Sequence, residues 1–204
     1  YDCSINYVDG IIKKFLDFLG DQKLMDNTII VITSDHGATI PNLPVRDDTK
    51  HRIRKFYDEL YHIPLIIYDK DSKPGEFKGL VSSVDINSTL LDMVGIKIPK
   101  SFRGKSIISK NFNREYVVSE NQGRGPCDLD QKATSVCVRS KFKKIVYEFK
   151  KYKLNDGKVI EAYDLLNDSE EYNNLYDDKF FLKECSFLIE KAKDRIKDIY
   201  GIKL

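Results

Sequence analysis

The run Thr28-Ile29-Ile30-Val31-Ile32-Thr33 constrains the fold of this chain more than any other feature. Every residue in it is β-branched and none alternates with a polar one, so the run predicts a strand covered on both faces, as in a parallel sheet. An amphipathic helix is expected before it, because apolar residues recur in steps of three and four from Ile5 to Leu19, and Gly20 ends the pattern. Helix, short turn and buried strand make half of an α/β repeat.

Further elements of the same kind follow along the first half of the chain. Residues 37–54 are polar and predict a long loop, after which the apolar run 63–68 predicts a second buried strand. Helical spacing of apolar residues over 84–94 predicts a helix, with Gly95 as a candidate C-cap. Residues 1–110 are therefore expected to form the late part of a doubly wound α/β sheet.

The second half of the chain, residues 111–204, follows a different pattern. Short strands are expected at 116–118 and at 162–165, and segments 134–139 and 142–149 are spaced like the two arms of a hairpin. An amphipathic helix is predicted from Phe181 to Ile199, where apolar residues again keep helical spacing. This half is expected to be a small α+β subdomain with an antiparallel sheet and a terminal helix.

Composition excludes several classes of partner. The 204 residues carry 34 basic and 32 acidic side chains, a net charge of +2, and the two signs are interleaved along the chain. This near-equal number of basic and acidic side chains argues against a nucleic-acid partner. No apolar run reaches the roughly 18 residues that a membrane span needs, so no span is expected. The first residues show no signal-peptide pattern, and the compartment stays open.

The chemistry is expected at Ser34-Asp35-His36-Gly37, directly after the first predicted strand. Ligands of open α/β sheets gather at the carboxyl ends of strands, and Gly37 would let the backbone bend away sharply. A carboxylate and an imidazole in this position suit a divalent cation that binds an anionic ester. The simpler alternative is an aspartate that caps the strand end beside an incidental histidine.

The order of short motifs around this tetrapeptide resembles that of the sulfatases, in the alkaline-phosphatase superfamily. Each motif alone is weak, but they follow one another in the family's order over nearly the whole chain. They include Asp26-Asn27-Thr28-Ile29-Ile30, Ser34-Asp35-His36-Gly37, Tyr57-Asp58-Glu59, His62-Ile63-Pro64-Leu65-Ile66-Ile67, Val84-Asp85-Ile86, Thr89-Leu90-Leu91, Gly95-Ile96, Gly104-Lys105-Ser106-Ile107, Tyr163-Asp164-Leu165 and Asn174-Leu175. The resemblance implies an alkaline-phosphatase-like doubly wound sheet followed by a sulfatase-type C-terminal subdomain.

The resemblance also implies a divalent metal and a set of residues around it. Asp35 and His36 match the family's metal-binding pair, and the implied ion is calcium, with manganese or zinc as alternatives. A basic residue before the Tyr57 motif contacts the sulfate in the family, so Lys55 or Arg54 is expected to bind the anion, with His51 as an alternative proton donor. Surface solvation is the simpler explanation for each of these three.

One residue of the later motifs is expected to be structural and not chemical. Asp85, in the motif Val84-Asp85-Ile86, is predicted to cap or brace the helix that begins there.

A nucleophile is missing from the expected pattern. In the family it is a cysteine or serine in C/S-x-P/A-x-R, early in the chain, and none of the four cysteines here has that context. The chain is therefore interpreted as the C-terminal portion of a metal-dependent hydrolase of sulfate esters, inactive by itself. It would act on a sulfated or phosphorylated small molecule or glycan, together with a missing N-terminal segment or through self-association. Alternatives are a phosphoester or phosphonate hydrolase or phosphotransferase of the same superfamily, and a non-catalytic binding or scaffold remnant.

Overall fold

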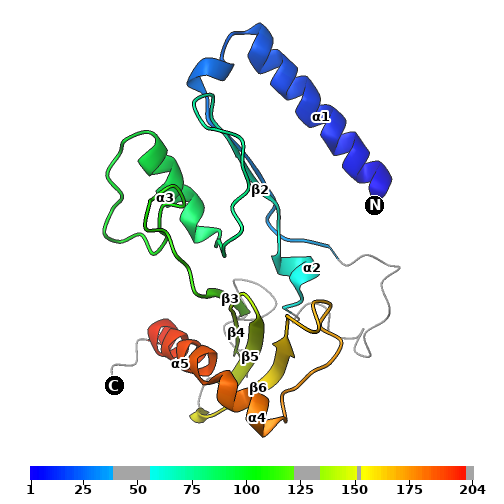
Figure 1. Ribbon diagram of the computed structural model, residues 1–204, viewed down its shortest axis with the longest axis vertical. Helices are drawn as coiled ribbons and strands as arrows, with labels where there is room; N and C mark the ends of the chain where they lie inside the picture. The colour runs from blue at the N-terminus through cyan, green and yellow to red at the C-terminus, as the bar shows by residue number, and fades with distance from the viewer. Residues whose placement is uncertain (39–55, 122–133, 151–152, 201–204) are drawn as a thin grey trace. The chain divides into compact units, whose positions relative to one another are not determined.

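The structure is a computed structural model that describes residues 1–38, 56–121, 134–150 and 153–200. It is a mixed α/β chain with two antiparallel sheets and a terminal helical segment, which confirms the expected fold class (Figure 1). The chain divides into two compact units. The N-terminal unit is drawn from Tyr1–Thr49 and Tyr57–Glu76, and the C-terminal unit from Lys50–Phe56 and Phe77–Leu204.

The N-terminal unit contains the first predicted helix and both predicted strands. Its elements are α1 (Asp2–Asp21), the short 3-10 helix η1 (Met25–Asn27), β1 (Ile30–Thr33), α2 (Asp58–Tyr61) and β2 (Leu65–Tyr68). The predicted helix and the two predicted strands are therefore confirmed, with α1 beginning a few residues before the apolar pattern that predicted it.

The pairing of these two strands differs from the expectation. β1 and β2 run antiparallel, with Thr33 opposite Leu65 and Ile30 opposite Tyr68. Neither strand has a buried residue, and Ile66 is 57% exposed. An unbroken β-branched run specifies a strand that tolerates cover on both faces, but it carries no information on the direction of its neighbour. Doubly wound sheets commonly carry an antiparallel edge strand, so the pairing is compatible with the expected class.

The C-terminal unit contains one helix, a four-stranded sheet and a helical pair at its end. In chain order the elements are α3 (Val84–Met93), β3 (Val117–Asn121), β4 (Thr134–Arg139), β5 (Lys143–Lys150), β6 (Lys153–Asp164), α4 (Lys179–Glu184) and α5 (Ser186–Tyr200). The predicted hairpin is β4 and β5. The predicted final helix is interrupted at Cys185, and Asp178 caps α4 by accepting from the N–H groups of Phe180 and Phe181.

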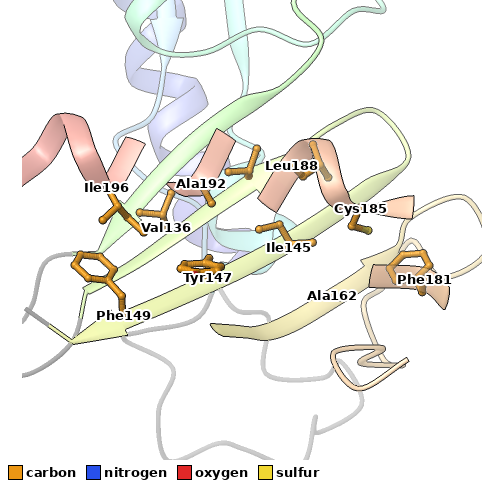
Figure 2. Close-up of a cluster of buried hydrophobic side chains, with 11 residues drawn as sticks. Val136, Ile145, Tyr147, Phe149, Ala162, Phe181, Cys185, Leu188, Ala192 and Ile196 are labelled. Carbon is orange, nitrogen blue, oxygen red and sulfur yellow. The ribbon is translucent and has the colours of Figure 1, made fainter. Parts of the chain in front are cut away.

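The four strands form an antiparallel meander in the order β3-β4-β5-β6, so each strand pairs with its neighbour in the sequence. One face of this sheet carries the main core. Figure 2 shows Leu188, Ala192 and Ile196 of α5 pointing toward Val136 of β4 and Ile145 of β5. Side chains alternate along a strand, so the residues between these face the other way.

The second face of the sheet combines a small apolar cluster with buried charges. Val146 and Cys137 pack there against Phe56, which is 1% exposed. Lys144 lies beside them along β5 and forms a buried ion pair with Glu171. A buried charge is tolerated only when it is paired, so this ion pair accounts for a lysine inside the sheet.

Asp85 braces α3, as its sequence context predicts. The side chain is fully buried and accepts from the N–H of Ser82, at 2.9 Å, and from the N–H of Lys105, at 2.8 Å. Arg114 donates to both carboxylate oxygens. Asp85 thus joins the start of α3 to two later segments of the C-terminal unit.

Among the described residues, no helix is both long enough and apolar enough to cross a bilayer.

Candidate metal-binding site

The Asp35-His36 pair lies directly after β1, at the end of the two-stranded sheet. Thr33, the last residue of β1, donates from Oγ1 to the carbonyl of Pro64 at 2.8 Å, which ties the strand end to the start of β2. The side chains of Asp35 and His36 are 86% and 76% exposed. The two candidate ligands therefore project from a fixed strand end and are open to a ligand.

The side chains of Asp35 and His36 lie close to each other. Asp35 Oδ2 lies 3.7 Å from His36 Nε2, while Asp35 Oδ1 accepts from the backbone N–H of His36 at 2.9 Å. Two ligands at right angles on an ion, each about 2.4 Å from it, would be about 3.4 Å apart. The spacing of these two atoms is close to that of adjacent ligands on one cation.

The histidine ring is oriented by a backbone contact. His36 Nδ1 lies 2.7 Å from the carbonyl oxygen of Gly37. A carbonyl oxygen only accepts, so this hydrogen bond requires the proton on Nδ1 and leaves the lone pair of Nε2 available. Metal-binding histidines commonly donate their second ring nitrogen to a carbonyl or carboxylate in this way.

Gly37 allows the backbone to turn closely against α2. Its N–H donates to the carbonyl of Leu60 at 2.8 Å. A Cβ at Gly37 would lie 2.0 Å from the carbonyl oxygen of Glu59, a distance at which the backbone would have to move. The sequence predicts a sharp bend at Gly37, and the close approach to α2 explains why this position needs a glycine.

Ser34 also stabilises this corner, a role that its sequence context did not predict. Its hydroxyl donates to the carbonyl of His36 at 2.7 Å. In a serine turn the hydroxyl accepts from a backbone N–H, whereas here it donates to a carbonyl, so the residue types alone give no signal for this bond.

Three further residues were predicted for this site. Lys55, Arg54 and His51 lie outside the described residues. Within the described ranges no group of three or more His, Cys, Asp or Glu side chains is arranged to hold a metal. The donor chemistry of Asp35 and His36 fits a divalent cation, but two ligands alone leave most of its coordination sphere to other groups.

Two family models match the chain. The model described as Sulfatase matches residues 1–96. The model described as N-sulphoglucosamine sulphohydrolase, C-terminal, matches residues 50–199, which is more than half of the chain.

Curated relatives match most of the chain. An N-acetylglucosamine-6-O-sulfatase of Bacteroides thetaiotaomicron is 30% identical over 217 residues, an alignment that covers 97% of this chain and 36% of the relative. Arylsulfatase K of Homo sapiens is 26% identical over 182 residues, covering 82% of this chain and 31% of the relative. The chain therefore spans about a third of the length of these relatives.

Solved structures show the same relation. A 2-O GAG sulfatase is 27% identical with a TM-score of 0.63, and the match covers 87% of this chain and 39% of that one. A protein solved in complex with its substrate, D-glucosamine-2-N,6-O-disulfate, has a TM-score of 0.67 and covers 97% of this chain and 39% of its own. At 23% identity, the second match is a likeness of fold alone.

Proposed function

Because the chain belongs to the sulfatase family and corresponds to the C-terminal portion of its members, we propose that it supplies part of the metal site of a sulfate-ester hydrolase. The observation that carries the proposal is the corner after β1, where Asp35 Oδ2 and His36 Nε2 lie 3.7 Å apart. Calcium is the proposed ion, with manganese or zinc as alternatives. Bound there, a divalent cation would polarise the ester and stabilise the charge that develops on it.

The chain's own contribution is to bind and orient that ion. Asp35 would supply a carboxylate oxygen and His36 the Nε2 lone pair, both held by backbone contacts in the same corner. We further propose that Lys55 or Arg54 binds the anionic group, with His51 as an alternative proton donor. The roles of these three residues are proposed from the family resemblance. Substituting each residue and measuring activity would test them.

We propose that the nucleophile comes from a segment outside these 204 residues, because no cysteine here has the family's nucleophile pattern. The partner of this chain would then be an N-terminal segment of the same protein, or a second copy where the chain is isolated. The proposed substrate is a sulfated glycan or small molecule. Support comes from the relatives, which include an N-acetylglucosamine-6-O-sulfatase.

We also propose a functional division near residue 110. Residues 1–110 would complete the α/β domain that bears the metal site, and residues 111–204 would form the sulfatase-type subdomain. The division by contacts differs, since it groups α3 with the four-stranded sheet. Limited proteolysis that released a stable fragment beginning near residue 77, and none beginning near 111, would contradict our boundary.

The decisive test measures hydrolysis of sulfated substrates by the protein purified from its source. We expect metal-dependent release of sulfate, lost on chelation and restored by the added ion, and a large loss of activity in Asp35→Ala. The 204-residue chain alone should release none. Asp92→Ala, an exposed aspartate on α3, is the matched control and should keep full activity.

Two results would overturn the proposal. Unchanged turnover and metal content in Asp35→Ala would show that the corner after β1 is not the metal site. Release of phosphate from a phosphoester, with no release of sulfate, would move the protein to a phosphoester-cleaving branch of the superfamily.

A further inference from the structure

Ser34 lies next to the proposed ligands Asp35 and His36, and its hydroxyl forms a hydrogen bond with the backbone of His36. Ser34 Oγ donates to the carbonyl oxygen of His36 at 2.7 Å and lies 3.5 Å from Asp35 Oδ1. The hydroxyl therefore closes a turn around the peptide that joins Asp35 to His36. Serine hydroxyls make such local bonds readily when the backbone leaves a strand.

This turn holds the peptide plane on which the histidine ring depends. The His36 carbonyl belongs to the peptide whose N–H is that of Gly37, and that N–H donates to Leu60 O at 2.8 Å. The peptide is thus held at its carbonyl by Ser34 and at its N–H by α2. The next carbonyl, that of Gly37, accepts from His36 Nδ1. Freeing the first carbonyl would loosen the second and with it the orientation of the ring.

We propose that Ser34 is a positioning residue for the metal site. Its hydroxyl holds the corner in the conformation in which Asp35 Oδ2 and His36 Nε2 face the same ion. This inference rests on the proposed metal site, since a positioning residue needs a site to position. The competing explanation is a serine that stabilises a turn and has no effect on the ligands.

Manganese binding to the whole protein that contains this chain separates these explanations. Free Mn²⁺ is measured by its electron paramagnetic resonance signal while the protein is titrated. Removing a partner that orients a metal ligand weakens metal affinity by roughly 10- to 100-fold, so we expect Ser34→Ala to weaken Mn²⁺ binding by about tenfold. Ser34→Thr keeps the hydroxyl and should restore the affinity.

Ser72→Ala is the matched control for this titration. Ser72 lies in the turn after β2 in the same unit, and its exposed hydroxyl donates to Asp69 Oδ2 at 3.1 Å. Its loss removes a similar hydrogen bond away from the proposed site, so Mn²⁺ affinity should not change. Asp35→Ala reports on the metal site itself and should abolish binding above background.

A second measurement needs no metal. In the metal-free chain, the ¹⁵N chemical shifts of the His36 ring report which nitrogen carries the proton. We expect Nδ1 to carry it in the native chain and in Ser34→Thr, and the two nitrogens to share it in Ser34→Ala. A turn with no effect on the ring would leave these shifts unchanged.

These measurements distinguish failure of the Ser34 role from failure of the metal site. Native Mn²⁺ affinity and native ring shifts in Ser34→Ala, with binding lost in Asp35→Ala, would overturn the role of Ser34 and leave the metal site standing. Native affinity in Asp35→Ala would overturn the metal site and the role of Ser34 with it.

Discussion

At the scale of single residues, the corner after β1 depends on a close backbone approach that only glycine permits. We expect Gly37→Ala to destabilise the N-terminal unit by about 1–3 kcal/mol, because the new Cβ would overpack against the Glu59 carbonyl. Urea unfolding monitored by circular dichroism measures the change. The proposed Mn²⁺ site should weaken in the same variant.

Gly75→Ala is the control for this substitution. Gly75 belongs to the same unit, and a Cβ there meets nothing within 4 Å. It should leave stability nearly unchanged. Equal effects of the two alanines would mean that the contact with α2 does not constrain the corner.

A buried thiol gives the C-terminal unit a dependence on alkaline pH. Burial raises the pKa of Cys185 from 9.0 to about 11, although the Lys143 ammonium partly opposes the shift. A folded pKa above the unfolded one means that the neutral thiol adds stability below pH 9.0, and that this stability is lost as the pH rises toward about 11. The midpoint of urea unfolding should therefore fall across this interval.

Cys185→Ala isolates the thiol from other groups that titrate in the same range. The variant loses packing and should be less stable at every pH, but its stability should decline less steeply above pH 9.0. A decline as steep as that of the native chain would assign the pH dependence to lysines or tyrosines.

How well sequence predicts the site differs from residue to residue. Asp35 and His36 stand out because a carboxylate beside an imidazole after a strand is a chemical signal readable without coordinates. The hydrogen bond from Ser34 to the His36 carbonyl depends on backbone angles, and the contact of Gly37 with Glu59 joins residues far apart in the chain. Neither of these two contacts can be predicted from the residue types alone.

At the scale of elements, the segment after β6 covers the edge of the four-stranded sheet. Asn174 accepts from the N–H of Ala162 at 2.9 Å and donates to the carbonyl of Ile160 at 3.2 Å. The N–H of Leu175 donates to the Ala162 carbonyl at 2.8 Å. The motif Asn174-Leu175, which served above as a sign of family, therefore occupies backbone groups that an edge strand would otherwise expose.

We expect Asn174→Ala to cost about 1–3 kcal/mol, because the N–H of the fully buried Ala162 loses its acceptor. Urea unfolding measures the loss, and light scattering should detect more aggregation from the uncovered edge. Asn173→Ala changes an exposed neighbour and serves as control. Similar stabilities for both variants would show that the edge is covered without this side chain.

Elements were predicted best where their pattern is local. The hairpin β4–β5 follows from two apolar arms around a short turn, and α3 from its spacing and from Gly95, which adopts a φ of 72°. The extent of β6 was missed, since the strand begins at Lys153 and only its end looks strand-like. Its pairing with β5 includes register shifts, which a simple alternation of side chains cannot reveal.

At the scale of the whole molecule, α1 presents a half-exposed apolar stripe among the described residues. Ile5, Val8, Ile11 and Phe15 are each about half exposed, at 52%, 51%, 48% and 54%. Exposed apolar surface of this kind favours association. We expect the isolated chain to self-associate at micromolar concentration, as measured by sedimentation velocity, unless a companion segment covers the stripe.

Charged substitutions in the apolar stripe of α1 test whether it drives self-association. The double substitution Ile11→Lys with Phe15→Lys should shift the chain toward the monomer. Asp9→Lys, outside the stripe, should not. A chain that remains monomeric at all concentrations would argue that α1 needs no cover, and would weaken the proposal that these residues are a portion of a larger enzyme.

The order of the strands in the C-terminal unit has a consequence for how the chain folds. Because β3, β4, β5 and β6 pair with their sequence neighbours, most contacts of this sheet join residues that are close in the chain. Low contact order favours rapid folding, since little loop entropy is lost before each contact forms. During synthesis, each hairpin can close as soon as its second arm has emerged. The helix α5, which covers Val136 and Ile145, follows β6 in the chain and can pack on the sheet only after all four strands have emerged.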